Sequence, residues 1–213
     1  MAHTSDPDLL AALALRLKGF GEAGDVAAVH GLDVDTTRAT LEQLAADGKC
    51  MAREVDGVTK FVLTPTGREE GEAALAAELD AIGERAGVQE AYERFLELNG
   101  QMLQLCTDWQ VIDDGSGDQQ LNDHSDDDYD AEVLSRLVDL DGQLRQVLAP
   151  LRGALARYDG YPARFRNALD RLLSGELDYF TKPIIPSSHT VWFELHEDLL
   201  ATLGIDRASE GST

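Results

Sequence analysis

The first thirty residues place apolar side chains at the spacing of an α-helix. Leu9, Leu13 and Leu17 recur every four residues, behind aspartates that can cap a helix and ahead of Gly19, which can end it. A short second helix is predicted in the segment GDVAAVHG, residues 24–31. The chain is therefore expected to begin with two short helices joined by a glycine-containing turn.

A third helix is predicted between Asp33 and Gly48. Asp33 stands where an N-cap belongs, and Thr37, Leu41 and Leu44 recur at the spacing of one helical face. Gly48 can adopt the left-handed backbone conformation that commonly ends a helix. The opposite face of this helix then presents mostly polar and charged residues to solvent.

The pattern changes to alternation in CMAREVDGVTKFVLT, residues 50–64. Two short runs with alternating apolar residues flank Asp56-Gly57. Asp-Gly is a strong hairpin signal, because a two-residue type I′ turn needs positive φ at both central positions. The segment is therefore predicted to form a β-hairpin, followed by a helix rich in alanine and glutamate that starts near Pro65.

The chain from residue 86 onward is predicted to be helical. One stripe of residues, at alternating spacings of four and three, indicates a buried or partner-facing side with a single polar member, Asn99. A second amphipathic helix follows a polar segment. The first stripe consists of Val88, Tyr92, Phe95, Asn99, Met102 and Cys106, and the second of Val133, Leu137, Leu140, Leu144, Val147 and Leu151.

Proline and glycine are expected to divide the end of the chain into shorter elements. Pro150 and the YDGYP turn at residues 158–162 should break the helix, and Gly175 should close the next one. The segment YFTKPIIPSS is expected to be an extended linker before a terminal helix that Ser187 or Ser188 caps. The inward stripe of that helix is expected to contain Val191, Leu195 and either Leu199 or Leu200.

Length and composition fit a folded protein with one small and one medium domain. The predicted elements make its fold mainly α with a small β-hairpin. The chain has 213 residues, of which 43% are hydrophobic, enough to bury a core. No run approaches the roughly 18 apolar residues that a membrane span needs, and the N-terminus lacks the pattern of a secretory signal. We therefore expect no membrane association and a cytoplasmic location.

The formal net charge of −22 disfavours binding to nucleic acid and to anionic membranes. The most negative segment per residue is the polar loop at 111–130, which carries eight acids and no lysine or arginine. An EF-hand frame starting at Asp126 fails, because Ala131 and Leu137 stand where glycine and glutamate are needed. The acidic loop is therefore interpreted as solvated and mobile, and no metal site is predicted.

No motif makes a case for an enzyme. Cys50 and Cys106 belong to no CxxC pair, so both are interpreted as small buried or half-buried side chains. His196-Glu197 departs from the His-Glu-x-x-His pattern of zinc peptidases, and phosphate-binding and nucleophile-elbow motifs are missing from the sequence. We therefore expect no catalytic residues, no metal and no cofactor.

A small-molecule site can be assembled from aromatic, basic and histidine side chains in the second half of the chain, since ligand pockets pair apolar walls with a few polar groups. The arginines between residues 152 and 171 either pair internally, with the acidic loop or with Asp159 and Asp170, or bind an anionic phosphate or carboxylate compound. Structural packing is the alternative for Trp109 and the histidines. The candidate ligand-binding residues are Trp109, Arg164, Arg166, His189, Trp192 and His196.

The order of the predicted elements over residues 8–75 resembles a winged helix-turn-helix domain, with three helices, a hairpin wing and a following helix. The phrase FVLTPTGREEGEAAL, at 61–75, is similar to the end of the wing and the start of the next helix in MarR-like bacterial regulators. This resemblance implies a DNA-binding domain at residues 1–80. It also implies an all-α domain at 81–213 that forms a homodimer and binds a small anionic effector.

Under this interpretation the exposed face of the third helix and the wing contact double-stranded operator DNA. Phosphates and base edges are recognised by arginine and lysine, with threonine and glutamine as neutral donors. Arg38 is the one basic residue on the helix face, beside the acidic Asp35 and Glu42. The predicted DNA-binding residues are Thr36, Arg38, Thr40, Gln43, Lys49, Arg53 and Lys60.

A second hypothesis is an accessory protein that does not bind DNA. A winged domain is also a suitable protein-docking module, because a fold does not determine its function. The blocks YERFLELN, CTDWQ and HTVWFELHEDLL resemble segments that accompany phosphoenolpyruvate-utilising enzymes, which suggests such an enzyme as the partner protein. The sequence alone leaves both hypotheses open.

Overall fold

The structure is a computed structural model that describes residues 1–113 and 119–207. The chain gathers into two units. Unit 1 contains Met1–Val88, Ala154–Arg157 and the described part of Glu194–Thr213. Unit 2 contains the described part of Gln89–Gly153 together with Tyr158–Phe193. Each unit is therefore built from segments that are distant in sequence.

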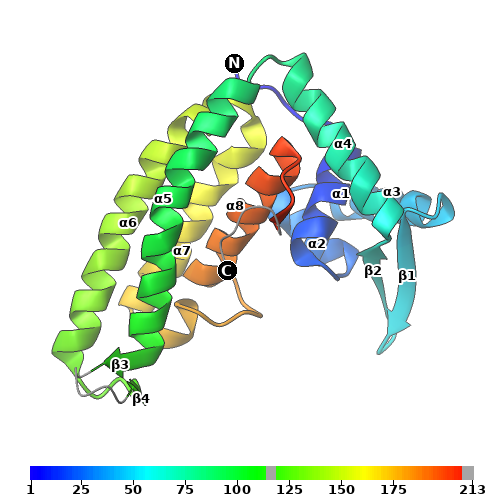
Figure 1. Cartoon of the computed structure of the whole chain (residues 1–213). Helices are drawn as coiled ribbons and strands as arrows, with labels where there is room; N and C mark the ends of the chain where they lie inside the picture. The colour runs from blue at the N-terminus through cyan, green and yellow to red at the C-terminus, as the bar shows by residue number, and fades with distance from the viewer. Residues whose placement is uncertain (114–118, 208–213) are drawn as a thin grey trace. The chain divides into compact units, whose positions relative to one another are not determined.

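Unit 1 begins with three helices, α1 (Pro7–Lys18), α2 (Ala23–His30) and α3 (Val34–Ala46), as predicted (Figure 1). Asp33 is confirmed as the N-cap of α3, because its carboxylate accepts a hydrogen bond from the Thr36 amide at 2.8 Å. Accepting this bond holds the pKa of the Asp33 carboxyl below its usual value.

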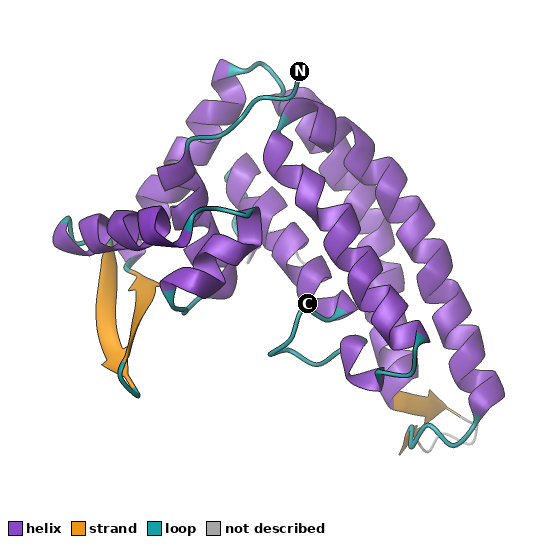
Figure 2. Ribbon diagram, turned by 180° about the vertical axis from the view of Figure 1, so that it is seen from behind, coloured by secondary structure: helices purple, strands orange, loops and turns teal. Residues whose placement is uncertain are grey.

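The predicted hairpin follows as β1 (Cys50–Val55) and β2 (Val58–Leu63), paired antiparallel and drawn as the long orange arrows of Figure 2. Asp56 and Gly57 both have positive φ, 53° and 78°, as a type I′ turn requires. Phe61 of β2 also exchanges two backbone hydrogen bonds with Gly21, at 2.8 and 3.2 Å. The base of the hairpin is therefore tied to the turn between α1 and α2.

Helix α4 (Pro65–Ala81) starts directly at the end of β2. The Thr64 hydroxyl accepts a hydrogen bond from the Gly67 amide and donates to the carbonyls of Gly48 and Lys49. Gly67 packs so closely on Lys49 that a Cβ at this position would lie 1.8 Å from the Lys49 carbonyl oxygen. The first turn of α4 is therefore pinned to the connection between α3 and β1.

The core of unit 1 lies between α1, α2, α3, β2 and α4, and residues from the end of α8 complete it. The buried residues of this core are Leu13, Ala14, Leu15, Leu17, Ala23, Val26, Val29, Leu41, Cys50, Phe61, Leu75 and Ala201. Thr37 of α3 is also buried, whereas Leu44, predicted on the same face, is half-buried.

Unit 2 is formed mainly by α5 (Arg85–Gln110), α6 (Asp127–Ala154), α7 (Gly160–Leu173) and the start of α8 (Ser188–Leu203). Helices α5 and α6 lie side by side in Figures 1 and 2. Both predicted stripes are confirmed, since their members are buried apart from Cys106, which is half-buried. The fold class, mainly α with a small β-hairpin, is also confirmed.

The acidic loop at 111–130 contains more structure than the sequence predicted. Val111–Asp113 (β3) pairs with Gln119–Leu121 (β4) as a second antiparallel hairpin, while residues 114–118 lie outside the described residues. After β4, Asp130 accepts a hydrogen bond from the Asn122 side chain, and its other oxygen lies 2.9 Å from Nδ1 of His124. The described part of the segment therefore contains regular structure, although most of its residues are exposed as a solvated loop would be.

Pro150 does not break the chain as expected, because α6 continues to Ala154. The proline is exposed, so the carbonyl that loses its hydrogen-bond donor in the preceding turn faces solvent. Buried leucines on both sides of the proline hold the helix in place by packing. The break predicted at YDGYP is present but lies earlier, because α6 ends at Ala154 and α7 already begins at Gly160. A 3-10 turn at Ala156–Asp159 leads directly into α7, and Pro162 fits its first turn, where backbone N–H groups lack helical partners.

The expected extended linker before α8 is instead a 3-10 turn at Leu177–Tyr179 followed by further turns. The Ser187 hydroxyl donates to the Lys182 carbonyl at 2.8 Å, which folds the segment back on itself. Ser187 is the N-cap of α8, since its oxygen accepts from the Thr190 amide at 3.2 Å.

Among the described residues, no helix is long and apolar enough to cross a membrane.

Candidate nucleic-acid interface and buried charge network

The outer face of α3 carries the predicted recognition residues. Thr36, Arg38 and Gln43 are exposed there, together with the acidic Asp35 and Glu42. The face is left open because only Thr37 and Leu41 of this helix are fully buried in unit 1. Arg38 is the single cation on a surface that also carries two carboxylates.

Four of the seven predicted DNA-binding side chains are engaged with nearby carboxylates. Such pairs reduce what a side chain offers to a phosphate, because its donors are already used and its charge is neutralised. The pairs are Thr36 Oγ1 with Asp33 at 2.8 Å, Thr40 Oγ1 with Asp8 at 2.5 Å, Gln43 Nε2 with Asp47 at 2.9 Å and Lys49 Nζ with Glu70 at 2.9 Å.

The other three are Arg38 on α3 and two residues of the hairpin, Arg53 and Lys60. Arg53 and Lys60 are direct cross-strand partners, so their like charges share one face of the hairpin. The Lys60 ammonium lies 5.4 Å from the centre of the Phe20 ring. Within the part of the chain that the structure describes, none of the three makes an ion pair.

The remaining cations of unit 1 all pair with carboxylates inside the unit. Pairing of this kind holds elements together and leaves little net charge for an external ligand. These cations are Arg16, Lys18, Lys49, Arg68, Arg85, Arg157 and Arg207. Among the described lysines and arginines of unit 1, those without such a partner are thus confined to α3 and the hairpin.

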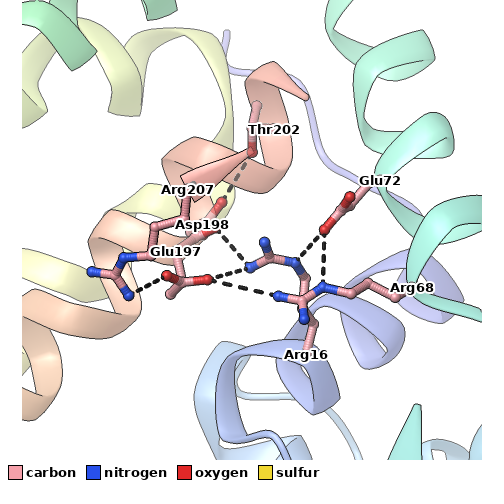
Figure 3. Close-up of polar contacts among 7 residues, drawn as sticks. All are labelled: Arg16, Arg68, Glu72, Glu197, Asp198, Thr202 and Arg207. Carbon is pink, nitrogen blue, oxygen red and sulfur yellow. Dashed lines mark hydrogen bonds and ion pairs between the residues drawn. The ribbon is translucent and has the colours of Figure 1, made fainter. Parts of the chain in front are cut away.

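A cluster of charged side chains ties α8 to α1 and α4 within unit 1 (Figure 3). Glu197 of α8 accepts from Arg16 Nη1 at 3.0 Å and from Arg207 at 2.7 Å. Arg16 Nε also donates to Glu72 at 2.8 Å, and Arg68 Nε donates to the same oxygen at 3.2 Å. We call these five residues the Glu197 cluster.

A second, more deeply buried group centres on Arg157, whose side chain is 0% exposed. Its guanidinium donates to Glu78 at 2.7 Å, Ser5 at 2.9 Å and Thr202 at 2.8 Å, and lies 3.4 Å from Asp198. Four segments of unit 1 therefore meet at one arginine.

These two groups were missed by sequence reasoning, which assigned α8 a single inward stripe. In the structure Leu199 and Leu200 are both buried, and so are the polar Glu194, Glu197 and Asp198. A usable signal was present, because the apolar residues of this segment surround the helix on every side, which is typical of a buried helix. Its acids then need cationic partners in the fold.

The candidate ligand-binding residues contact different protein side chains. Trp109 stacks on Phe180, with ring centres 4.7 Å apart, and also contacts the His124 ring. Trp192 stacks on Phe95 at 4.9 Å and donates from Nε1 to Asn99 at 2.9 Å. Both indoles are therefore used in the packing of unit 2.

The basic and histidine candidates have packing roles of their own. Arg166 pairs with the buried Asp141 at 2.8 Å, and the Arg164 guanidinium lies over the Tyr161 ring. His189 is half-buried, and this desolvation lowers the pKa of its imidazole, whereas His196 is buried in unit 1. The internal pairing that the sequence allowed for the arginines is also seen for Arg152 with Asp159, Arg157 with Glu78 and Asp198, and Arg171 with Glu176.

Both cysteines are expected to resist alkylation in the folded protein. Burial raises the pKa of the Cys50 thiol and raises the pKa of Cys106 to about 12, so neither forms much thiolate at neutral pH. A thiol-reactive dye should label both only after unfolding. Rapid labelling of Cys106 by the native protein at neutral pH would contradict this expectation.

Comparison of the chain with protein-family models, with curated proteins and with solved structures finds no match.

Proposed function

We propose that the protein is a DNA-binding transcriptional regulator whose unit 1 is a winged helix-turn-helix domain. The observation that carries this proposal is the selective placement of unneutralised cations. Among the described lysines and arginines of unit 1, only Arg38, Arg53 and Lys60 make no ion pair. The sequence predicts that all three contact DNA. Cations without a carboxylate partner can displace counterions from phosphates.

The local geometry of α2 and α3 supports the proposal. Gly31, in the left-handed conformation with φ of 67°, ends α2, and Asp33 then starts α3. Two helices joined by such a short glycine-containing turn are typical of a helix-turn-helix motif. The hairpin after α3 takes the place of the wing, with Arg53 and Lys60 on one of its faces.

The acids around α3 set limits on the affinity. Asp35 and Glu42 are exposed beside Arg38, so phosphate contacts on this helix are partly opposed by repulsion. With about three phosphate contacts per subunit, the logarithm of the binding constant should fall with the logarithm of salt with a slope of roughly −3 per subunit. A homodimer would double that slope.

The test is binding of fluorescent duplex DNA, taken from upstream of the protein's own gene, at two salt concentrations. Arg38→Ala should weaken binding about tenfold and reduce the salt slope by roughly one per subunit. Arg94→Ala removes one exposed cation from α5 of unit 2 and serves as the matched control, with little change expected. Undetectable binding at micromolar protein in low salt, or equal effects of the two variants, would refute the proposal.

A second candidate function is docking onto a partner protein, and exposed apolar side chains favour it. Phe20, Met51 and Val58 are 45%, 44% and 38% exposed, and the last two share a face of the hairpin with Arg53 and Lys60. Apolar residues beside cations suit an acidic protein surface. Purification of one stoichiometric partner with the wild-type protein, combined with a negative DNA assay, would favour this function.

A further inference from the structure

A pocket of about 360 Å³ lies in unit 1 where α1, the end of β2 and the first turn of α4 meet. Its apolar wall contains buried and half-buried side chains, and two guanidinium groups form its polar part. The lining residues are Leu15, Arg16, Gly19, Val62, Leu63, Thr64, Pro65 and Arg68. None of the residues previously predicted to bind a ligand lines it.

Several charged side chains lie next to this pocket. The Glu197 cluster contains three guanidinium groups, those of Arg16, Arg68 and Arg207, and two carboxylates, those of Glu72 and Glu197 (Figure 3). Each carboxylate is shared by more than one arginine. Arg16 and Arg68 therefore lie beside the pocket together with two carboxylates.

The two arginines in the pocket lining are held differently. The Arg16 side chain is 7% exposed and is fixed by hydrogen bonds to Glu72 and Glu197, which use its Nε and Nη1 atoms. The Arg68 side chain is 54% exposed, donates once, from Nε to Glu72, and its Nη2 lies 3.9 Å from Glu197. Arg68 thus retains donors that can turn toward a ligand while Arg16 remains in place.

We propose that this pocket binds a small oxyanion, a carboxylate or a phosphate, carried on a compact apolar body. Arg68 would donate to the oxyanion in the two-pronged geometry that guanidinium groups share with carboxylates and phosphates. The charge-assisted hydrogen bonds that Arg68 can donate favour an anion over a neutral molecule. Leu15, Val62 and Leu63 provide the apolar wall for the body of the ligand.

Binding at this pocket would act on the hairpin, because three lining residues, Val62, Leu63 and Thr64, form the end of β2 and its link to α4. An effect of the ligand on DNA binding, through the hairpin, rests on the proposed function. Binding of the ligand itself does not. The experiment therefore measures the ligand alone, without DNA.

Calorimetric titration of the full chain with hexanoate, hexyl phosphate, inorganic phosphate and hexanol tests the proposal. One or both of the alkyl anions should bind with a stoichiometry of one per chain, and hexanol should bind much more weakly. A preference between hexanoate and hexyl phosphate identifies the headgroup. Failure of both alkyl anions to bind at millimolar concentration overturns the proposal.

Two variants locate the site. Arg68→Gln should weaken binding of the alkyl anion about tenfold, as expected for the loss of a charge-assisted hydrogen bond, while the control Arg94→Gln should not. Val62→Phe keeps every charge and fills the apolar wall, so it should also weaken binding. Circular dichroism checks that each variant is folded. Equal affinities for Arg68→Gln and Arg94→Gln would place the anion elsewhere and refute the assignment.

Discussion

Replacing Arg157 by methionine is expected to lower the free energy of unfolding by about 3–5 kcal/mol. The guanidinium is fully buried and is shared by Glu78, Asp198, Ser5 and Thr202. Methionine has a similar length but offers no charge and no donor. The variant therefore leaves buried carboxylates without their cationic partner, and the cost of an uncompensated buried charge exceeds the net gain from forming the pair.

Urea-induced unfolding followed by far-UV circular dichroism measures this loss. Arg152→Met is the matched control, since Arg152 pairs with Asp159 on the surface, where both side chains are about half exposed. An exposed pair of this kind contributes about 0–1 kcal/mol. Similar small losses for the two variants would mean that the Arg157 group does not join the segments of unit 1.

A single added methyl group on α4 is expected to have opposite effects at two glycines. At Gly67 the new Cβ would lie 1.8 Å from the Lys49 carbonyl oxygen and 2.7 Å from the carbonyl carbon, so the backbone must move. Gly67→Ala should therefore destabilise the protein by about 3 kcal/mol, at the upper end of the usual cost of overpacking. The Thr64 hydrogen bonds to the same connection should weaken with it.

Gly71→Ala, one turn further along α4, provides the control. A Cβ at Gly71 meets nothing within 4 Å, and alanine in a helix interior is favoured over glycine by about 0.5–1 kcal/mol. Thermal unfolding of the two variants should shift the midpoint in opposite directions. A stabilising effect of Gly67→Ala would show that α4 does not approach Lys49 as closely as described.

The position of helix α8 also matters for the proposed regulator. Helix α8 contributes its first residues to unit 2, where Trp192 packs on Phe95, and its last residues to unit 1, where Glu197 and Asp198 pair with arginines. Unit 1 therefore includes the last described residues of the chain. We expect a fragment truncated after the N-terminal third to lack part of the core and both charge groups.

Local features of the fold could be predicted from neighbouring residues alone. The capping of α3 by Asp33, the Asp56-Gly57 turn and the capping of α8 by Ser187 each depend on side chains and backbone groups a few positions apart. The apolar stripes of α5 and α6 were predictable because helical periodicity is itself a local property.

Features that depend on distant partners could not be predicted in this way. Arg16 and Glu197 are 181 positions apart, so nothing near either residue indicates the pair. Pro150 remains inside α6 because the packing of its flanking leucines outweighs one lost hydrogen bond, and that packing is set by the rest of unit 2. The β3–β4 hairpin likewise joins segments whose polar sequence indicated a loop.

For the candidate interface, the sequence by itself determined a helix, a glycine-containing turn and a hairpin with cations at known positions. Only the tertiary structure decided which of those cations are already neutralised. Lys49 pairs with Glu70 of α4, whereas Arg38, Arg53 and Lys60 have no carboxylate partner among the described residues. The reason is physical, because ion pairing depends on distance in the folded chain and not on separation along the sequence.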